Sequence, residues 1–185
     1  MISKLKKGDS VALISDFSSF LNSDNPELVG FDQSEDEILI DGNPSSISLR
    51  NYEFINGINK LAKRLDSMGI SLIVQHMTPL TRGLPEVVEC VSLFNWFGKS
   101  CTFQLKSEHL KARQDFDASL RELDKNNSNL FVFDPIDKIC PDIYCSYLSQ
   151  NGTVLYRDKA HFSDDASAML SDEFLQFLRK HRTSI

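Results

Sequence analysis

Three short, continuous apolar runs stand out along the chain. They cover 11–14, 70–74 and 130–133, and polar or turn-forming residues bound each of them closely. Runs of this length, interrupted only by Ser71, are typical of strands that are buried on both faces. We therefore expect three core strands.

Amphipathic segments separate these runs. Apolar residues at helical spacing predict helices over 51–67, 105–124 and 164–180, the first of them closed by Met68-Gly69. Strands that alternate with helices predict a three-layer α/β/α fold with a parallel, doubly wound sheet. In such a fold the functional site lies at the carboxyl ends of the strands.

Two segments lack this periodicity. A polar stretch over 22–48, rich in Ser, Asp, Asn and Pro, predicts a long insertion loop, with Glu37 to Gly42 as one small strand or hairpin arm. The region from Gln75 to Thr102 is interrupted by proline and glycine and is expected to be irregular.

Composition narrows the class of protein. A chain of 185 residues with 41% hydrophobic and 25% charged residues predicts one globular domain over 1–185. The formal net charge of -6 argues against nucleic acid or anionic lipid as a partner, because both require a basic surface. No apolar run reaches the roughly 20 residues that span a bilayer, and no apolar segment follows the basic N-terminus. We expect neither a transmembrane segment nor an export signal in this chain.

The four cysteines form two close pairs in the sequence, Cys90 with Cys101 and Cys140 with Cys145. Their spacing fits disulfides in an oxidising compartment or buried thiols in the cytosol, and the absence of a signal peptide slightly favours thiols. A zinc site is a weaker third interpretation, because the tight spacing of zinc knuckles is missing.

The strongest candidate for chemistry is the pair Asp158 and His161, just before the last predicted helix. A carboxylate three residues before a histidine can accept a hydrogen bond from Nδ1 and leave Nε2 as a base, which is the arrangement of a hydrolytic triad. Chance spacing is the competing interpretation, and the position after the last strand favours the catalytic one. Ser163 is expected to cap the last helix.

The other histidines and the single tryptophan are weaker candidates. His76 follows the second strand, where an ordinary loop role is favoured over a place in the cleft. His109 is expected on the solvated face of a charged helix, and His181 near a frayed tail. Trp96 is expected in a satellite hydrophobic cluster under a loop.

The tripeptide Gly8-Asp9-Ser10 is similar to the serine motif of a large class of esterases. A nucleophilic serine in that class follows its strand, whereas Ser10 precedes the apolar run 11–14. We therefore interpret Lys7-Gly8-Asp9 as a turn that enters the sheet.

From about residue 5 to 178 the chain resembles an SGNH domain of the kind fused to membrane acyltransferase 3 proteins, which O-acetylate cell-surface polysaccharides. The residues that carry the resemblance are Cys140-Pro141, Cys145, Asn151-Gly152, Leu155-Tyr156-Arg157-Asp158, His161-Phe162-Ser163, Ala166 and Leu170.

The resemblance implies a flavodoxin-like sheet and an acetyl transfer or ester hydrolysis by a Ser-His-Asp triad. In that triad Asp158 orients the general base His161. It also implies disulfides Cys90–Cys101 and Cys140–Cys145, an extracytoplasmic location, a membrane acyltransferase 3 domain as acyl donor and a glycan as acceptor. No cofactor and no metal is implied.

The chain departs from this family at two places. The Gly-Asp-Ser-His block that carries the nucleophile is not found, and Asp16-Phe17-Ser18 stands where relatives often have Arg-Trp-Ser. We therefore expect a partial domain that lacks its first strand and is inactive alone. The alternatives are a non-catalytic binding or scaffolding domain and a cytosolic regulatory domain with free thiols.

Overall fold

The computed structural model describes residues 4–14, 39–40, 42–44, 46–79, 90, 101–158 and 161–181. Four expectations fall wholly or mostly outside these residues: the cluster around Trp96, the departure at Asp16-Phe17-Ser18, the conformation of most of the 22–48 insertion and the irregular course of most of 75–102.

A parallel sheet of three strands forms the centre of the molecule, as the apolar runs predicted. Its strands are β1 (Ser10–Leu13), β4 (Ser71–Gln75) and β6 (Leu130–Phe133), in the order β1-β4-β6. Both pairings are parallel, and Ile73 lies between Ala12 and Phe131 in register. The central strand β4 is buried along almost its whole length, because side chains cover both of its faces.

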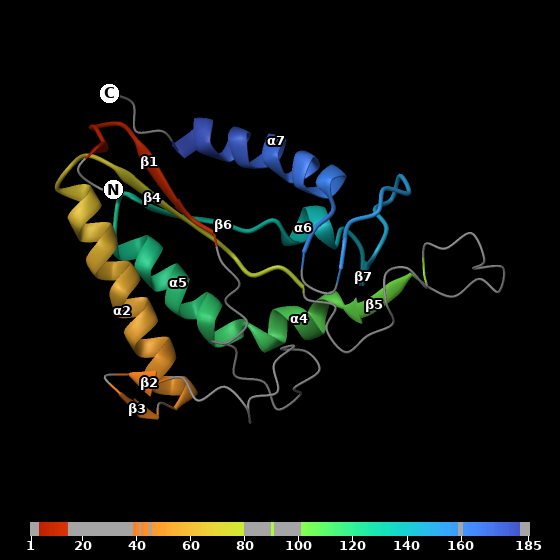
Figure 1. Cartoon of the computed structure of the whole chain (residues 1–185), viewed down its shortest axis with the longest axis horizontal. Helices are drawn as coiled ribbons and strands as arrows, with labels where there is room; N and C mark the ends of the chain where they lie inside the picture. Colours follow the sequence, from red (N-terminus) through yellow and green to blue (C-terminus); the bar gives the residue numbers. More distant parts are fainter. Residues whose placement is uncertain are drawn as a thin grey trace.

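Helices cover both faces of this sheet (Figure 1). On one face, α2 (Ile47–Asp66) and α5 (Gln114–Asn126) pack against each other and against the strands. On the other face lies α7 (Asp164–His181), whose Phe174 and Phe177 rings contact the ring of Phe133. The fold is therefore the expected three-layer α/β arrangement.

The helix α2 begins earlier than its apolar spacing predicted. The side chain of Ser46 accepts a hydrogen bond from the backbone N–H of Leu49 at 3.2 Å, which caps the helix there. After the helix, Gly69 adopts a φ of +68°, and a Cβ at this position would lie 2.8 Å from Cγ of Lys7. A glycine is required here because the N-terminal turn packs so closely: the N–H of Gly8 donates to the carbonyl of Gly69 at 2.9 Å.

The single helix predicted over 105–124 is wrong. Two helices occupy this region, α4 (Lys106–Ala112) and α5, and the chain bends between them at Arg113. Apolar periodicity continues through the bend, so the pattern alone did not reveal it. The bend turns the Arg113 side chain into the interior, where 2% of the residue is exposed.

A second lobe extends beyond the carboxyl ends of β4 and β6 (Figure 1). It contains the antiparallel pair β5 (Thr102–Leu105) and β7 (Tyr144–Ser146) together with the short helix α6 (Ile136–Ile139). Its strands are short, and the sequence pattern did not predict them. The small hairpin of β2 (Leu39–Ile40) and β3 (Asn43–Pro44) lies close to the arm expected over 37–42.

None of the described helices is long and apolar enough to cross a membrane.

Candidate functional site

Asp158 and His161 meet in an exposed turn. Nδ1 of His161 lies 2.8 and 2.9 Å from the two carboxylate oxygens of Asp158, and the backbone N–H of His161 donates to the same carboxylate at 2.9 Å. A carboxylate accepts, so the proton of this contact sits on Nδ1. The imidazole side chain is 66% exposed, and Nε2 has no partner among the described residues. Nε2 is therefore available to take a proton from a neighbouring group.

A narrow antiparallel bridge forms the base of this turn. Tyr156 is paired with Phe162, and the N–H of Arg157 donates to the carbonyl of His161 at 2.8 Å. Below them, the N–H of Ser163 donates to the carbonyl of Leu155 at 3.0 Å. The bridge joins the two ends of the turn and so brings Asp158 and His161 close together.

The start of α7 anchors the turn on its other side. The hydroxyl of Ser163 accepts a hydrogen bond from the N–H of Ala166 at 3.1 Å and donates to the carbonyl of Val154 at 2.5 Å. The prediction that Ser163 caps the last helix is confirmed. The hydroxyl is occupied by these two bonds, which leaves it unsuited to act as a nucleophile.

Ser10 lies far from this turn. Together with Gly8 and Asp9 it lines a hollow of about 340 Å³ whose other wall includes Leu178 and Arg179, near the end of α7. His161 precedes the start of the same helix. From Asp164 to Leu178, α7 spans about 20 Å at its usual rise, so Ser10 and His161 are at opposite ends of the sheet.

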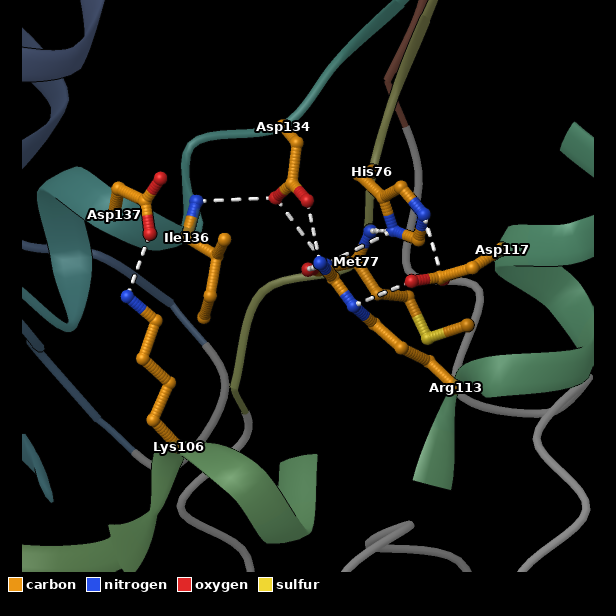
Figure 2. A network of polar contacts seen from close by, with 8 residues as sticks. All are labelled: His76, Met77, Lys106, Arg113, Asp117, Asp134, Ile136 and Asp137. Carbon is orange, nitrogen blue, oxygen red and sulfur yellow. Dashed lines mark hydrogen bonds and ion pairs between the residues drawn. The ribbon is translucent and has the colours of Figure 1, made fainter. Parts of the chain in front are cut away.

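A second polar cluster lies at the carboxyl ends of β4 and β6, with the buried Arg113 at its centre and the partly exposed Asp134 at its rim (Figure 2). Its guanidinium donates to the carbonyl of Met77 at 2.9 Å and forms a two-pronged contact with the carboxylate of Asp134. Its Nε lies 3.3 Å from a carboxylate oxygen of Asp117, one helical turn further along. One side chain thus joins the segment after β4, the segment after β6 and the first turn of α5.

His76 is held inside the same cluster. Its Nδ1 accepts from the N–H of Met77 at 2.8 Å and faces the Arg113 guanidinium at 3.1 Å, while its Nε2 lies 2.7 Å from Asp117. Because both neighbours of Nδ1 are donors, the ring proton sits on Nε2. Both nitrogens are occupied and 5% of the residue is exposed, so His76 is not available as a base. It follows its strand as expected, but its role is to join buried groups.

His109 is buried, which corrects the expectation of a solvated surface position. Only 3% of the residue is exposed, because the bend at Arg113 turns this face of α4 inward. Burial, aided by the positive charge of Arg113, lowers the pKa of His109 from 6.5 to about 4, although Asp134 and a hydrogen bond with the Met77 backbone act in the opposite direction. His109 is therefore an uncharged core residue at neutral pH.

His181 was expected near a frayed tail, and residues 182–185, which follow it, lie outside the described part of the chain. It is the last residue of α7, and its ring lies 4.5 Å from that of Phe131 and 4.4 Å from that of Phe177, measured between centroids. The aromatic contacts order the end of the helix.

Both cysteine pairs are disulfides, Cys90–Cys101 and Cys140–Cys145, the pairing that the resemblance implied. No described cysteine is free, in contrast to the slight preference for thiols from composition. Cys140 and Cys145 are fully buried beneath the turn that carries His161, in a cluster with Tyr147, Leu155 and Tyr156. Disulfides of this kind are compatible with an extracytoplasmic location.

Within the described ranges, no cluster of three His, Cys, Asp or Glu side chains could hold a metal ion. The sequence pattern did not predict the Arg113 cluster. The i, i+4 spacing of Arg113 and Asp117 is a weak indication of an ion pair between them. No sequence pattern connects this pair with His76 or Asp134, which are distant in the chain.

One of three comparisons with known proteins found a match. No curated protein and no solved structure matches the chain. The family profile of the SGNH domain fused to AT3 domains matches residues 1–176, which is nearly the whole length. This family supports a hydrolase-like or acyltransferase-like function and a membrane acyltransferase as partner. With its parallel α/β sheet flanked by helices, the chain belongs to the SGNH domain family that is fused to AT3 domains.

Proposed function

We propose that this chain supplies the orienting carboxylate and the general base of an SGNH-type acyl-transfer site. Asp158 is the orienter and His161 the base. The observation that carries the proposal is the hydrogen-bonded pair itself: Nδ1 of His161 contacts both carboxylate oxygens of Asp158, and Nε2 has no partner among the described residues. This is the relation between base and orienter in a hydrolytic triad.

The proposed chemistry proceeds in two proton-coupled steps. A serine hydroxyl attacks the carbonyl carbon of an acyl donor and gives its proton to Nε2 of His161, which returns it to the leaving oxygen. A sugar hydroxyl then attacks the acyl-serine, again losing its proton to His161, and the serine hydroxyl is restored by that proton. Asp158 stays ionised and stabilises the imidazolium in both steps. Backbone N–H groups hold the oxyanion.

The nucleophilic serine in this proposal comes from a strand–helix unit outside the described residues. Flavodoxin-like sheets have the strand order 2-1-3-4-5, with the site at the point where the order reverses. Here β1, β4 and β6 are consecutive neighbours, both connecting helices lie on one face and α7 lies on the other, as expected for the third, fourth and fifth strands. The first strand would then lie beside β1 and the second strand beyond it, so two strands, and not the first alone, would lie outside the described sheet.

The side chains of β1 support this placement. Val11 and Leu13 pack against the core on the face of α2 and α5, whereas Ala12 is exposed and Ile14 is 59% exposed. The sequence of this strand is that of a fully covered central strand, yet only one of its faces is covered by described residues. An additional strand and helix would bury the rest.

The activity of the chain by itself tests this proposal. We expect no hydrolysis of p-nitrophenyl acetate by the purified chain that depends on His161, because the sequence contains no Gly-Asp-Ser-His block. The matched variants are His161→Ala and, as a control on the same lobe, Asp142→Ala. A rate that His161→Ala abolishes and Asp142→Ala leaves intact would show a complete site within the chain.

The coding sequence upstream provides the second test. An in-frame strand followed by Gly-Asp-Ser-His would support the acyl-transfer proposal. A promoter and start signal at this position would favour the alternative of a non-catalytic binding or scaffolding domain.

A further inference from the structure

Tyr156 connects the turn that carries His161 to the end of the central strand. It is 1% exposed and lies directly before Arg157 and Asp158. Its ring packs against those of Phe103 and Phe162, with centroids 5.6 and 5.2 Å away. Tyr156 also pairs with Phe162 through the backbone, so the residue itself forms part of the base of the turn.

The hydroxyl of Tyr156 reaches a different part of the fold. It donates to the backbone carbonyl of Pro79 at 3.0 Å, across a separation of 77 residues, and this contact is buried. Burial raises the pKa of Tyr156 far above its usual value, so the hydroxyl keeps its proton over the whole range in which a histidine base works. The hydrogen bond from Tyr156 to Pro79 is therefore independent of pH in this range.

Arg113 fixes the other end of this bond. Pro79 ends the described segment after β4, and two residues earlier the carbonyl of Met77 accepts from Arg113, whose guanidinium is itself held by Asp117 and Asp134 (Figure 2). The segment after β4 is thus attached to α5 and to the segment after β6. The hydrogen bond from the Tyr156 hydroxyl to the Pro79 carbonyl attaches the second lobe to this segment.

We propose that Tyr156 is a positioning residue, whose hydroxyl on Pro79 sets where the Asp158–His161 pair stands relative to the carboxyl ends of the strands. A nucleophile that arrives at that edge needs Nε2 of His161 within hydrogen-bond distance, and a displacement of about 1 Å can cost about a hundredfold in rate. This inference rests on the proposed role of His161 and adds the residue that places it.

The test compares Tyr156→Phe with the control Tyr144→Phe in the full chain, since Tyr144 is an exposed residue on β7. Two readouts are measured by NMR: hydrogen exchange at the Arg157 amide, which bonds to His161, and the tautomer of His161 from its ring nitrogen shifts. The loss of one buried hydrogen bond, with Pro79 left unpaired, is expected to speed exchange at Arg157 about tenfold. We also expect the single Nδ1–H tautomer of His161 to become a mixture. Tyr144→Phe leaves both readouts unchanged.

Exchange at the Leu72 amide, in the central strand, separates a local effect from global destabilisation. Faster exchange at Arg157 with unchanged exchange at Leu72 supports the proposal, whereas equal acceleration at both amides, or none at either, overturns it. Should Tyr156→Phe fail to fold, the wild-type hydroxyl proton of Tyr156 gives the answer. A slowly exchanging signal near the Pro79 protons supports the bond, and its absence contradicts it.

The outcomes also distinguish this inference from the proposed function. If wild-type His161 does not hold its proton on Nδ1, the proposed role of the Asp158–His161 pair fails. If wild-type His161 does so and Tyr156→Phe changes nothing, only the positioning role fails.

Discussion

His109 stays uncharged at neutral pH because its buried surroundings make the protonated form unfavourable. Protonation would place a positive charge in a buried site beside Arg113, whose own charge is permanent. In the unfolded chain the same imidazole is solvated and protonates near pH 6.5. The difference between the two states links folding to pH.

We expect the free energy of unfolding to fall as the pH drops from 6.5 towards 4. The folded pKa of His109, about 4, lies below the unfolded value of 6.5, so the unfolded state binds the proton first. His109 would contribute its stabilisation fully above pH 6.5 and lose roughly 3 kcal/mol of it by pH 4. Urea unfolding at pH 7.5 and 4.5 measures this change. The variant His109→Gln should show a smaller change than wild type, and Lys111→Gln, on the exposed side of α4, should match wild type.

At the scale of single elements, the bend between α4 and α5 depends on contacts of Arg113 with other segments of the chain. Arg113 could lie on the surface if 105–124 were one helix, and its guanidinium would then be hydrated. In the folded protein Met77, Asp117 and Asp134 replace that hydration, and Asp134 in turn accepts from the N–H of Ile136 at the start of α6. The bend therefore fixes the relative position of four elements.

The variant Arg113→Met should lower the free energy of unfolding by about 3 kcal/mol, because it leaves the carboxylates of Asp117 and Asp134 without their cation. Arg121→Met, on the exposed side of α5, is the matched control and should change stability by less than about 0.5 kcal/mol. Urea denaturation at pH 7 measures both. A loss at Arg113 no larger than the loss at Arg121 would show that the cluster adds nothing to stability.

The candidate pair and the buried cluster differ in how far their members are apart in the sequence. Asp158 and His161 belong to one turn, so local spacing was enough to predict their contact. Arg113, by contrast, meets His76 and Asp134 through the packing of three segments, and these contacts span 37 and 21 residues. Local periodicity carries no information on such contacts, which explains why the single helix and the solvated His109 were predicted wrongly.

At the scale of the whole molecule, β1 is the least protected part of the sheet. It pairs with β4 along one edge, and its other edge has no strand among the described residues. Ile14 at its end is 59% exposed, and Leu175 of α7 is 46% exposed. An apolar edge strand of this kind is a template for association with another chain.

We expect the purified chain to self-associate through this edge, and Ile14→Lys to reduce the associated fraction several-fold, because a charge at an exposed strand end opposes edge-to-edge pairing. Ile143→Lys is the matched control, since Ile143 is 72% exposed in the second lobe, away from β1. Sedimentation velocity at several protein concentrations measures both variants. Equal effects of the two substitutions would point to a general effect of charge and not to the edge of β1.

The sequence by itself determined the parallel α/β class, the three core strands, the serine cap of the last helix and the pairing of Asp158 with His161. Each of these depends on hydrophobic periodicity or on residues a few positions apart. The tertiary structure alone decided the bend at Arg113, the burial of His76 and His109, and the bond between Tyr156 and Pro79. Those features come from side chains that meet only when separate segments pack, and the desolvation of each group is set by neighbours that lie far away in the chain.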